Sequence, residues 1–293
     1  MTRLVTSIAE LNQAKDEVAT HRRVPVDPER RRNYFAVVMT MGALHDGHAA
    51  LMEAARHLVG PHGVVIVTVF VNPTQFAPGE DFERYPRNLD ADFNVCLQHE
   101  VDIVFAPEAG EIYQDDVPTL HAGHLGEILE GAIRPGHFDG VVTVVNRFLR
   151  IVEPGIAVFG DKDYQQLVII RNMVREQDLP VTIVGVPTIR ESDGLAMSSR
   201  NRYLDPQQRE LARALSIALD AGRKSANDGA DAVLVATQAT LAAYGVEPDY
   251  VEVTDVGLGP TPDIGEARLL VAARIGDTRL IDNCEVQIGY GRR

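Results

Sequence analysis

Short apolar runs recur along the first two-thirds of the chain, and segments with helical spacing follow several of them. The runs cover residues 34–40, 64–71, 101–106, 156–159 and 181–186. They are almost continuously apolar and do not alternate, which is typical of parallel strands buried on both faces of a sheet. Repeated strand–helix–strand units predict an α/β fold with a doubly wound, Rossmann-like parallel sheet and right-handed crossovers.

The segments between the runs include two clear helices and one ambiguous stretch. In residues 47–58 the apolar side chains recur at i, i+3, i+4 and i+7, which is one face of a helix. A second helix is expected over residues 163–177, ending before Pro180. Residues 141–152 have the β-branched content of a strand and the length of a helix, and propensity alone does not decide between the two.

The pattern changes after about residue 188. Asp205 precedes Pro206, and Gln208 stands three residues after the Asp, which is the start of a capped helix. A second helix over 232–243 and short strands over 250–254, 268–274 and 278–283 follow. We therefore expect two domains, a Rossmann-like domain over 1–188 and a smaller α+β domain over 189–293.

Composition narrows the class of partner. The 293 residues include 42 Asp and Glu against 28 Lys and Arg, a net charge of −14 that argues against nucleic acid or an anionic membrane as the main partner. No apolar run reaches the roughly 18–20 residues that a bilayer span needs, and the first residues lack a signal-peptide core. Cys96 and Cys284 lie far apart in the sequence and suit a reducing compartment. These features predict a cytoplasmic protein.

The first candidate for chemistry is the loop 39–48, M-T-M-G-A-L-H-D-G-H, between the first strand and first helix. Open α/β sheets bind ligands at this end of the strands. Gly42 and Gly47 permit close backbone approach, and His45 and His48, three residues apart, point the same way and can donate hydrogen bonds to phosphate. The alternative is a surface His pair that caps the helix. A two-His metal site is less favoured, because no third ligand lies nearby in the sequence.

Two further loops carry candidate cations. Lys162, one of only three lysines, follows the strand over 156–159, where it can act as a point charge on a phosphate or be an ordinary solvated lysine. Residues 190–201 contain Ser198, Ser199 and Arg200, which suit an anion-binding loop or a polar interdomain linker. The sequence has neither a G-x-G-x-x-G fingerprint nor a G-x-x-x-x-G-K-[ST] phosphate loop.

Taken together, H-x-G-H after the first strand and M-S-S-R after the last resemble the pair of signature motifs of a nucleotidyltransferase superfamily. This superfamily includes the class I aminoacyl-tRNA synthetases. Within it, the chain resembles the pantothenate synthetase (pantoate–β-alanine ligase) family. The resemblance rests on T-M-G-A-L-H-D-G-H (40–48), V-F-V-N-P-T-Q-F (69–76), Y-P-R (85–87), L-E-G-A-I-R-P-G-H-F-D-G-V (129–141), F-G-D-K-D-Y-Q-Q (159–166) and D-G-L-A-M-S-S-R-N-R-Y-L (193–204). Met39 stands where the family usually has Pro, and Asp46 and Asp161 where it often has Glu. The family fold implies that 141–152 is a helix. It also implies that the domain over 1–188 binds the nucleotide and pantoate and that the domain over 189–293 carries the M-S-S-R loop.

The resemblance implies a reaction and its participants. ATP-dependent condensation of pantoate with β-alanine would give pantothenate through a pantoyl adenylate, releasing AMP and pyrophosphate, with ATP as co-substrate, Mg²⁺ as its metal and a homodimer as the assembly. Another nucleotidyltransferase of the same superfamily is the nearest alternative. Its product would keep the nucleotide, which distinguishes it from a ligase that releases AMP. A non-catalytic nucleotide or small-ligand sensor is an alternative of a different class.

The resemblance also implies roles for individual residues. His45 and His48 contact the phosphates, with His48 as proton donor, and Lys162 stabilises the α-phosphate. Other nucleotide contacts are Thr40, Met41, Gly42, Gly47, Gly160, Asp161, Asp163, Ile189, Met197, Ser198, Ser199 and Arg200. Pantoate contacts are Gln75, Gln166, Met41 and Phe76, with Gln75 also reaching β-alanine, and Asn72, Arg134 and His137 are second-rank substrate candidates. Asp90 or Asp92 is a candidate Mg²⁺ ligand, against the alternative that both lie on a solvated helix face.

Overall fold

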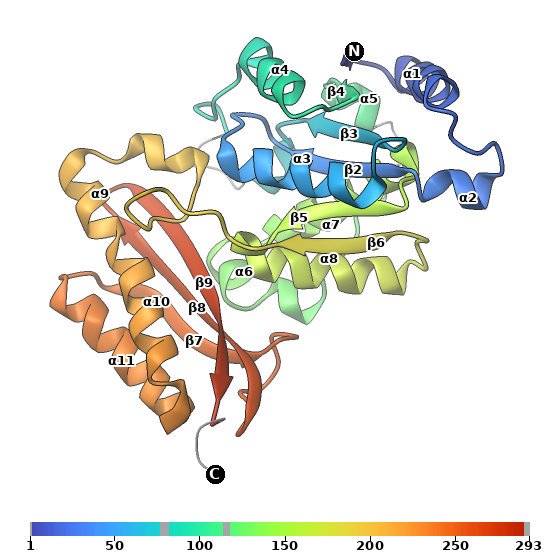
Figure 1. Cartoon of the computed structure of the whole chain (residues 1–293). Coiled ribbons are helices and arrows are strands. Elements are labelled where there is room, and N and C mark those ends of the chain that lie inside the picture. Colours follow the sequence, from blue (N-terminus) through green and yellow to red (C-terminus); the bar gives the residue numbers. More distant parts are fainter. Residues whose placement is uncertain (1, 77–81, 114–117, 290–293) are drawn as a thin grey trace. The chain divides into compact units, whose positions relative to one another are not determined.

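The computed structural model describes residues 2–76, 82–113 and 118–289 and divides the chain into two compact units (Figure 1). The N-terminal unit comprises residues 1–161 and 165–187, and the C-terminal unit comprises 188–293. The short segment Lys162–Tyr164 groups with the C-terminal unit although its flanking residues group with the other.

The N-terminal unit is built on a six-stranded sheet of order β1-β4-β3-β2-β5-β6. Its strands are β1 (Arg3–Val5), β2 (Phe35–Thr40), β3 (Val64–Val69), β4 (Ile103–Phe105), β5 (Ile156–Gly160) and β6 (Thr182–Val186), and neighbouring strands are parallel. The predicted doubly wound parallel sheet is confirmed, with all five predicted strands. Strand β1 was not predicted, because its three residues are too few to show a period.

Helices connect these strands. They are α1 (Ile8–His21), α2 (Pro28–Arg32), α3 (Asp46–Val59), α4 (Leu89–Gln98), α5 (Ala109–Ile112), α6 (Glu130–Ile133), α7 (His137–Val152) and α8 (Tyr164–Glu176). Helix α3 packs on β2 and β5, where Met52 and Ala55 lie in one apolar cluster with Val38 and Val158. This packing fixes the start of α3 at the carboxyl end of β2.

The ambiguous stretch 141–152 lies inside helix α7, as the family resemblance implies. Its β-branched residues are buried on most sides of the helix, including Val142, Val145 and Val152. Burial of this apolar surface outweighs the small helix-propensity penalty of β-branched residues.

The C-terminal unit is a small α+β fold. Its antiparallel sheet has the order β7-β8-β9, from β7 (Pro248–Asp255), β8 (Gly265–Ile275) and β9 (Thr278–Ile288). Its helices are α9 (Pro206–Ala212), α10 (Ala214–Lys224) and α11 (Ala230–Ala243). The predicted capping box is present, since Asp205 and Gln208 each accept a hydrogen bond from the other's backbone.

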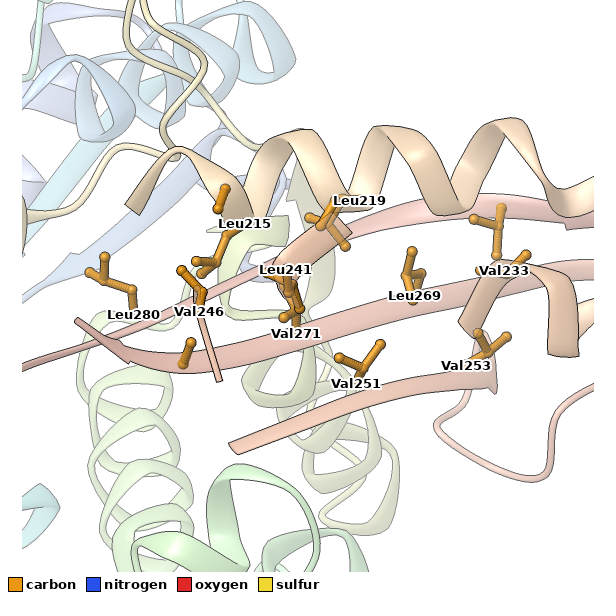
Figure 2. Packing of buried hydrophobic residues seen from close by; sticks show 14 of the residues in the cluster. Leu215, Leu219, Val233, Leu241, Val246, Val251, Val253, Leu269, Val271 and Leu280 are labelled. Carbon is orange, nitrogen blue, oxygen red and sulfur yellow. The ribbon is translucent and has the colours of Figure 1, made fainter. Parts of the chain in front are cut away.

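The core of the C-terminal unit lies between its helices and one face of its sheet. Figure 2 shows Leu215 and Leu219 of α10 facing strand residues that include Leu269 and Val271, and all four are fully buried. The helix that begins after Asp205 is interrupted at Arg213, so that α9 and α10 are separate helices. In the described part of the chain, no helix is long and apolar enough to cross a membrane.

Candidate functional site

The loop after β2 is shaped by a threonine and by left-handed backbone. The Thr40 hydroxyl donates to the carbonyl of Thr68 (2.8 Å) and accepts from the backbone N–H of Gly42 (3.2 Å). Gly42 has φ +79° and is followed by Ala43 at φ +51°, so two consecutive residues are left-handed. Only glycine adopts this conformation without strain, so the loop turns sharply at Gly42.

Asp92 of α4 holds the same loop from outside it. One carboxylate oxygen accepts from the backbone N–H of Ala43 (3.1 Å), and the other accepts from that of Leu44 (2.8 Å). A Cβ on Gly42 would lie 2.7 Å from an Asp92 oxygen, so a larger residue at this position would clash with the carboxylate. The side chain is buried, so the solvated-face alternative is wrong for Asp92, while Asp90 is exposed.

His45 and His48 cap the N-terminus of α3. The Nδ1 atom of His45 accepts from the backbone N–H of Gly47 (3.1 Å), and Nδ1 of His48 accepts from that of His45 (3.3 Å). The two ring centroids lie 4.1 Å apart. Since both Nδ1 atoms accept, the proton of each neutral ring lies on Nε2. The capping alternative and the phosphate-donor prediction are therefore compatible, because they use different nitrogens of the same rings.

The second cluster of predicted residues lies at the 3₁₀ turn η1 (Pro73–Gln75) after β3. Asn72 is fully buried, and its Oδ1 accepts from the Tyr113 hydroxyl (2.6 Å) and from the backbone and hydroxyl of Thr74 (3.3 and 3.0 Å). Its Nδ2 donates to the carbonyl of Gly140 in α7 (3.2 Å). Burial raises the pKa of Tyr113 although hydrogen bonds to Thr74 and Asn72 oppose the shift. Asn72 thus anchors the turn, with both ends of its amide used inside the protein.

Gln75, Arg134 and His137 come together at the same turn. The carbonyl of Gln75 accepts from His137 Nδ1 (2.8 Å) and from Arg134 (3.3 Å), and a guanidinium nitrogen of Arg134 also lies 3.1 Å from His137 Nε2. A His137 ring with its proton on Nδ1 satisfies both contacts. These hydrogen bonds hold the backbone of Gln75, whose side chain is buried.

Phe76 lies in an aromatic cluster beside this turn. Its ring centroid is 5.3 Å from that of Phe82 and 5.9 Å from that of Tyr85, both edge to face. The Arg87 guanidinium lies over the Phe82 ring and donates to the carbonyls of Phe82 (2.9 Å) and Tyr85 (3.4 Å). The Y-P-R motif thus supports the predicted apolar wall at Phe76, and Met41 is half-buried in the loop after β2.

The carboxyl end of β5 carries Gly160 and Asp161. A Cβ on Gly160 would meet nothing within 4 Å, whereas one on Gly185 of the neighbouring strand would lie 2.2 Å from an Asp161 carboxylate oxygen. Gln165 is buried and binds the segment before α6, donating to the carbonyls of Leu125 (2.7 Å) and Ile128 (2.8 Å). The adjacent Gln166 is half-buried.

Lys162 lies in a turn that is tied to the C-terminal sheet. Its carbonyl accepts from Nδ2 of Asn283 in β9 (2.8 Å), and its ammonium lies 3.4 Å from a carboxylate oxygen of Asp163. The Tyr164 hydroxyl donates to the carbonyl of Val256 (2.9 Å). These contacts explain why the segment Lys162–Tyr164 groups with the C-terminal unit.

The Met-Ser-Ser-Arg segment follows a small hairpin. Ile189 and Met197 are joined by a backbone hydrogen bond (2.9 Å), and Arg190 bridges to Ala196. Arg190 also forms a two-point ion pair with Asp282 of β9 (2.6 and 3.0 Å). Burial on its own would lower the pKa of Arg190, but the hydrogen bonds and charge of Asp282 raise it. Ile189 and Met197, two of the predicted nucleotide contacts, therefore lie on a hairpin that Asp282 holds through Arg190.

The 3₁₀ turn η4 (Ser199–Tyr203) continues from this hairpin. The Ser198 hydroxyl accepts from the backbone N–H of Arg200 (3.2 Å) and caps the turn. Glu191 accepts from Asn201 Nδ2 (2.7 Å) and from Arg209 (2.6 Å). The predicted anion loop is thus a capped turn tied to the hairpin and to α9.

No group of three or more His, Cys, Asp and Glu side chains suited to a metal ion occurs among residues 2–76, 82–113 and 118–289. The two predicted metal ligands also have different surroundings, because Asp92 is buried against the loop and Asp90 is exposed. Asp92 therefore supports the loop with both of its oxygens.

Sequence reasoning missed the residues that hold these loops from a distance. They are Tyr113 at η1, Gln165 before α6, Gly185 beside Asp161, and the β9 pair Asp282 and Asn283. Gln165 alone carried a local signal, as the first of two consecutive glutamines in the K-D-x-Q-Q block.

Comparisons with known proteins agree over nearly the whole chain. The sequence profile of a family described as Pantoate-beta-alanine ligase matches residues 3–285. A pantothenate synthetase from Mycolicibacterium smegmatis (strain ATCC 700084 / mc(2)155) is 51% identical over 287 residues, which are 97% of this chain and 90% of that protein. A pantothenate synthetase from Salinispora arenicola (strain CNS-205) is 50% identical over 294 residues, covering 98% and 99%.

Solved structures match in the same way. The crystal structure of pantothenate synthetase from Thermus thermophilus superposes with a TM-score of 0.86 at 43% identity and covers 96% of this chain and 98% of that one. A pantoate–β-alanine ligase from Francisella tularensis, complexed with "Beta-gamma ATP and Beta-alanine", gives a TM-score of 0.72 at 30% identity over 97% of both chains.

Proposed function

This chain belongs to the pantoate–β-alanine ligase family of ATP-dependent, amide-forming enzymes, and we propose that it makes pantothenate through a pantoyl adenylate. In the first step a carboxylate oxygen of pantoate attacks the α-phosphorus of ATP, and pyrophosphate leaves. In the second step the amine of β-alanine attacks the acyl carbon, the acyl–oxygen bond to AMP breaks, and the amine proton passes to solvent.

The observation that carries this proposal is that His45 and His48 come together at the start of α3, with their ring centroids 4.1 Å apart. Each Nδ1 accepts a backbone N–H at the start of this helix, and we assign the Nε2 atom of each ring to the phosphate oxygens. A helix N-terminus adds positive potential at the same place. A carboxylate is a weak nucleophile, so donors fixed where charge develops lower the barrier to its attack. His48 also delivers a proton toward the leaving group in this scheme.

The remaining cationic and hydroxyl groups bind the nucleotide. Lys162 stabilises the α-phosphate as its charge increases, and Arg200 binds phosphate together with Ser198 and Ser199. The other contacts come from the loop after β2, the end of β5 with its following turn, and the hairpin: Thr40, Met41, Gly42, Gly47, Gly160, Asp161, Asp163, Ile189 and Met197.

The cluster at η1 binds the two substrates that are joined. We assign the Gln75 amide to pantoate and β-alanine, and Gln166 supplies a second amide. Met41 and Phe76 form the apolar wall for the two methyl groups of pantoate. Asn72, Arg134 and His137 position Gln75 through its backbone and its turn.

Magnesium enters this scheme as part of the substrate, as the complex of Mg²⁺ with ATP. Mg²⁺ keeps several waters and takes phosphate oxygens as ligands, so the protein need supply few of its own. Asp90 remains the candidate carboxylate near the ion, because the oxygens of Asp92 already hold the loop. We also propose a homodimer and a cytoplasmic location, the latter because both cysteines are free thiols.

An assay of AMP release tests the proposed function. With ATP, pantoate and β-alanine present, we expect free AMP in a one-to-one ratio with pantothenate and no AMP when pantoate is omitted. A nucleotidyltransferase of the same superfamily would keep the nucleotide in its product, and a non-catalytic sensor would bind ATP without turnover. Either of these results would replace the proposal.

A further inference from the structure

We propose that Asn283 is a positioning residue for Lys162, and that it acts through the Lys162 backbone. The inference rests on the role proposed for Lys162 in adenylation. Asn283 lies on β9, 121 residues after Lys162, and its Nδ2 donates to the Lys162 carbonyl (2.8 Å). Every contact used below lies within the C-terminal unit.

A buried guanidinium fixes the amide of Asn283. Nε of Arg268 donates to the Asn283 Oδ1 atom at 2.7 Å, and a terminal nitrogen of the same guanidinium donates to it as well. Arg268 and Asn283 are 5% and 4% exposed, so little water competes for these bonds. Because Oδ1 is held by two N–H donors, Nδ2 must face the Lys162 carbonyl.

The same guanidinium holds the far end of the lysine turn. The Arg268 guanidinium carbon lies 4.0 Å from the centroid of the Tyr164 ring, within range of a cation–π contact. The Tyr164 hydroxyl is held in turn by the Val256 carbonyl (2.9 Å). The segment Lys162–Tyr164 is thus held at its first residue by Asn283 and at its last by Arg268.

The neighbour of Asn283 holds the other nucleotide-binding segment. Consecutive strand residues point to opposite faces, and Asp282 binds Arg190 at the base of the Ile189–Met197 hairpin while Asn283 binds the lysine turn. Strand β9 therefore sets the position of both segments. A shift of about 1 Å in a catalytic group lowers rates by roughly a hundredfold, so the Asn283 contact bears directly on turnover.

The test variant is Asn283→Asp, measured beside Lys162→Ala and the double variant. Aspartate keeps the acceptor for Arg268 but places a carboxylate oxygen against the Lys162 carbonyl. We expect kcat and ATP–pyrophosphate exchange to fall by roughly tenfold to a hundredfold, with the KM for β-alanine unchanged. Glu285→Gln is the matched control, because Glu285 touches the same Arg268 from a side chain that is 82% exposed, and we expect wild-type rates for it.

The double variant separates positioning from general damage. If Asn283 acts through Lys162, Asn283→Asp costs nothing further in the Lys162→Ala background. Wild-type rates for Asn283→Asp, or a loss that multiplies with that of Lys162→Ala, would overturn the inference. Wild-type rates for Lys162→Ala would instead overturn the role proposed for the lysine. If Asn283→Asp does not fold, Arg268→Lys replaces it as the test variant. We expect its kcat to fall by roughly threefold to tenfold. Its double variant with Lys162→Ala is interpreted in the same way.

Discussion

The carboxylate of Asp92 lies 2.8 Å from the backbone nitrogen of Leu44, from a position 48 residues further along the chain. Its second oxygen accepts from the next residue back, Ala43, so one side chain fixes two consecutive peptide groups just before the capping histidines. The loop that brings His45 and His48 to the end of β2 is therefore held from α4, as well as by its own glycine.

Replacing Asp92 with asparagine is expected to loosen this loop. One oxygen acceptor remains, but the amide NH₂ then faces a backbone N–H, so a hydrogen bond is lost inside the protein. We expect a loss of about 1–3 kcal/mol in the free energy of unfolding. The KM for ATP should rise as well, because His45 and His48 lose their fixed position.

Asp90→Asn is the matched control for the stability of this variant, since Asp90 is an exposed carboxylate on the same helix. Urea denaturation should give a wild-type midpoint for Asp90→Asn and a lower one for Asp92→Asn. Equal stability of the two variants would contradict the loop-holding role of Asp92.

Two substitutions of His48 separate its capping role from its chemical role. Glutamine at this position keeps an acceptor for the helix cap but removes the imidazole, while alanine removes both. We expect both variants to lower adenylation on the order of 10²–10³-fold, as loss of a fixed donor does. Only His48→Ala should also lose stability, by about 0.5–2 kcal/mol. Near-wild-type adenylation by a folded His48→Gln variant would remove the imidazole from the mechanism.

Gly160→Ala tests whether ATP approaches the end of β5. A Cβ there meets no protein atom within 4 Å, so we expect unchanged stability. If the nucleotide occupies the adjacent space, the KM for ATP rises by about tenfold, or roughly 1.4 kcal/mol of binding free energy. Gly110→Ala, an exposed helical glycine with similar open space, is the control and should leave KM unchanged. A wild-type KM for Gly160→Ala would place the nucleotide elsewhere.

Stability should fall at alkaline pH because of the two thiols. Burial and the nearby Asp92 charge raise the pKa of Cys96 to about 12, and burial and Asp282 raise that of Cys284 to about 11. An unfolded thiol titrates near 9.0, so above that pH the unfolded chain binds fewer protons than the folded one. The stabilisation is complete below pH 9 and is lost as the pH rises toward 11 and 12.

Urea midpoints at pH 8 and pH 10 measure this effect. The wild-type midpoint should drop more steeply than that of a Cys96→Ala, Cys284→Ala double variant. Equal drops in the two proteins would mean that the buried thiols do not contribute to the alkaline loss of stability.

The sequence predicts features that are encoded within a few consecutive residues, and it does not predict contacts between residues far apart in the chain. Continuous apolar runs predicted β2 through β6, and loops at strand ends indicated His45, His48 and Lys162, because each feature is encoded within a few residues. Asn283, which holds the lysine turn, has no local pattern in the sequence. Asp92 was expected only as a candidate Mg²⁺ ligand, and its hydrogen bond to the loop after β2 depends on how the chain folds.

Strand β1 was not predicted and the stretch in α7 was left undecided by propensity, because tertiary contacts decide both. Strand β1 has only three residues and is defined by its pairing with β4, so no periodicity could indicate it. The β-branched stretch in α7 was undecided from propensity, and its burial makes it helical. The family resemblance resolved the second case and had no bearing on the first.

The most direct test of the account is isotope exchange between labelled pyrophosphate and ATP with pantoate present and β-alanine absent. An enzyme that forms a pantoyl adenylate before the amine attacks will return label to ATP, and omission of pantoate will abolish the exchange. Absence of exchange by an enzyme that makes pantothenate when β-alanine is added would contradict the two-step mechanism.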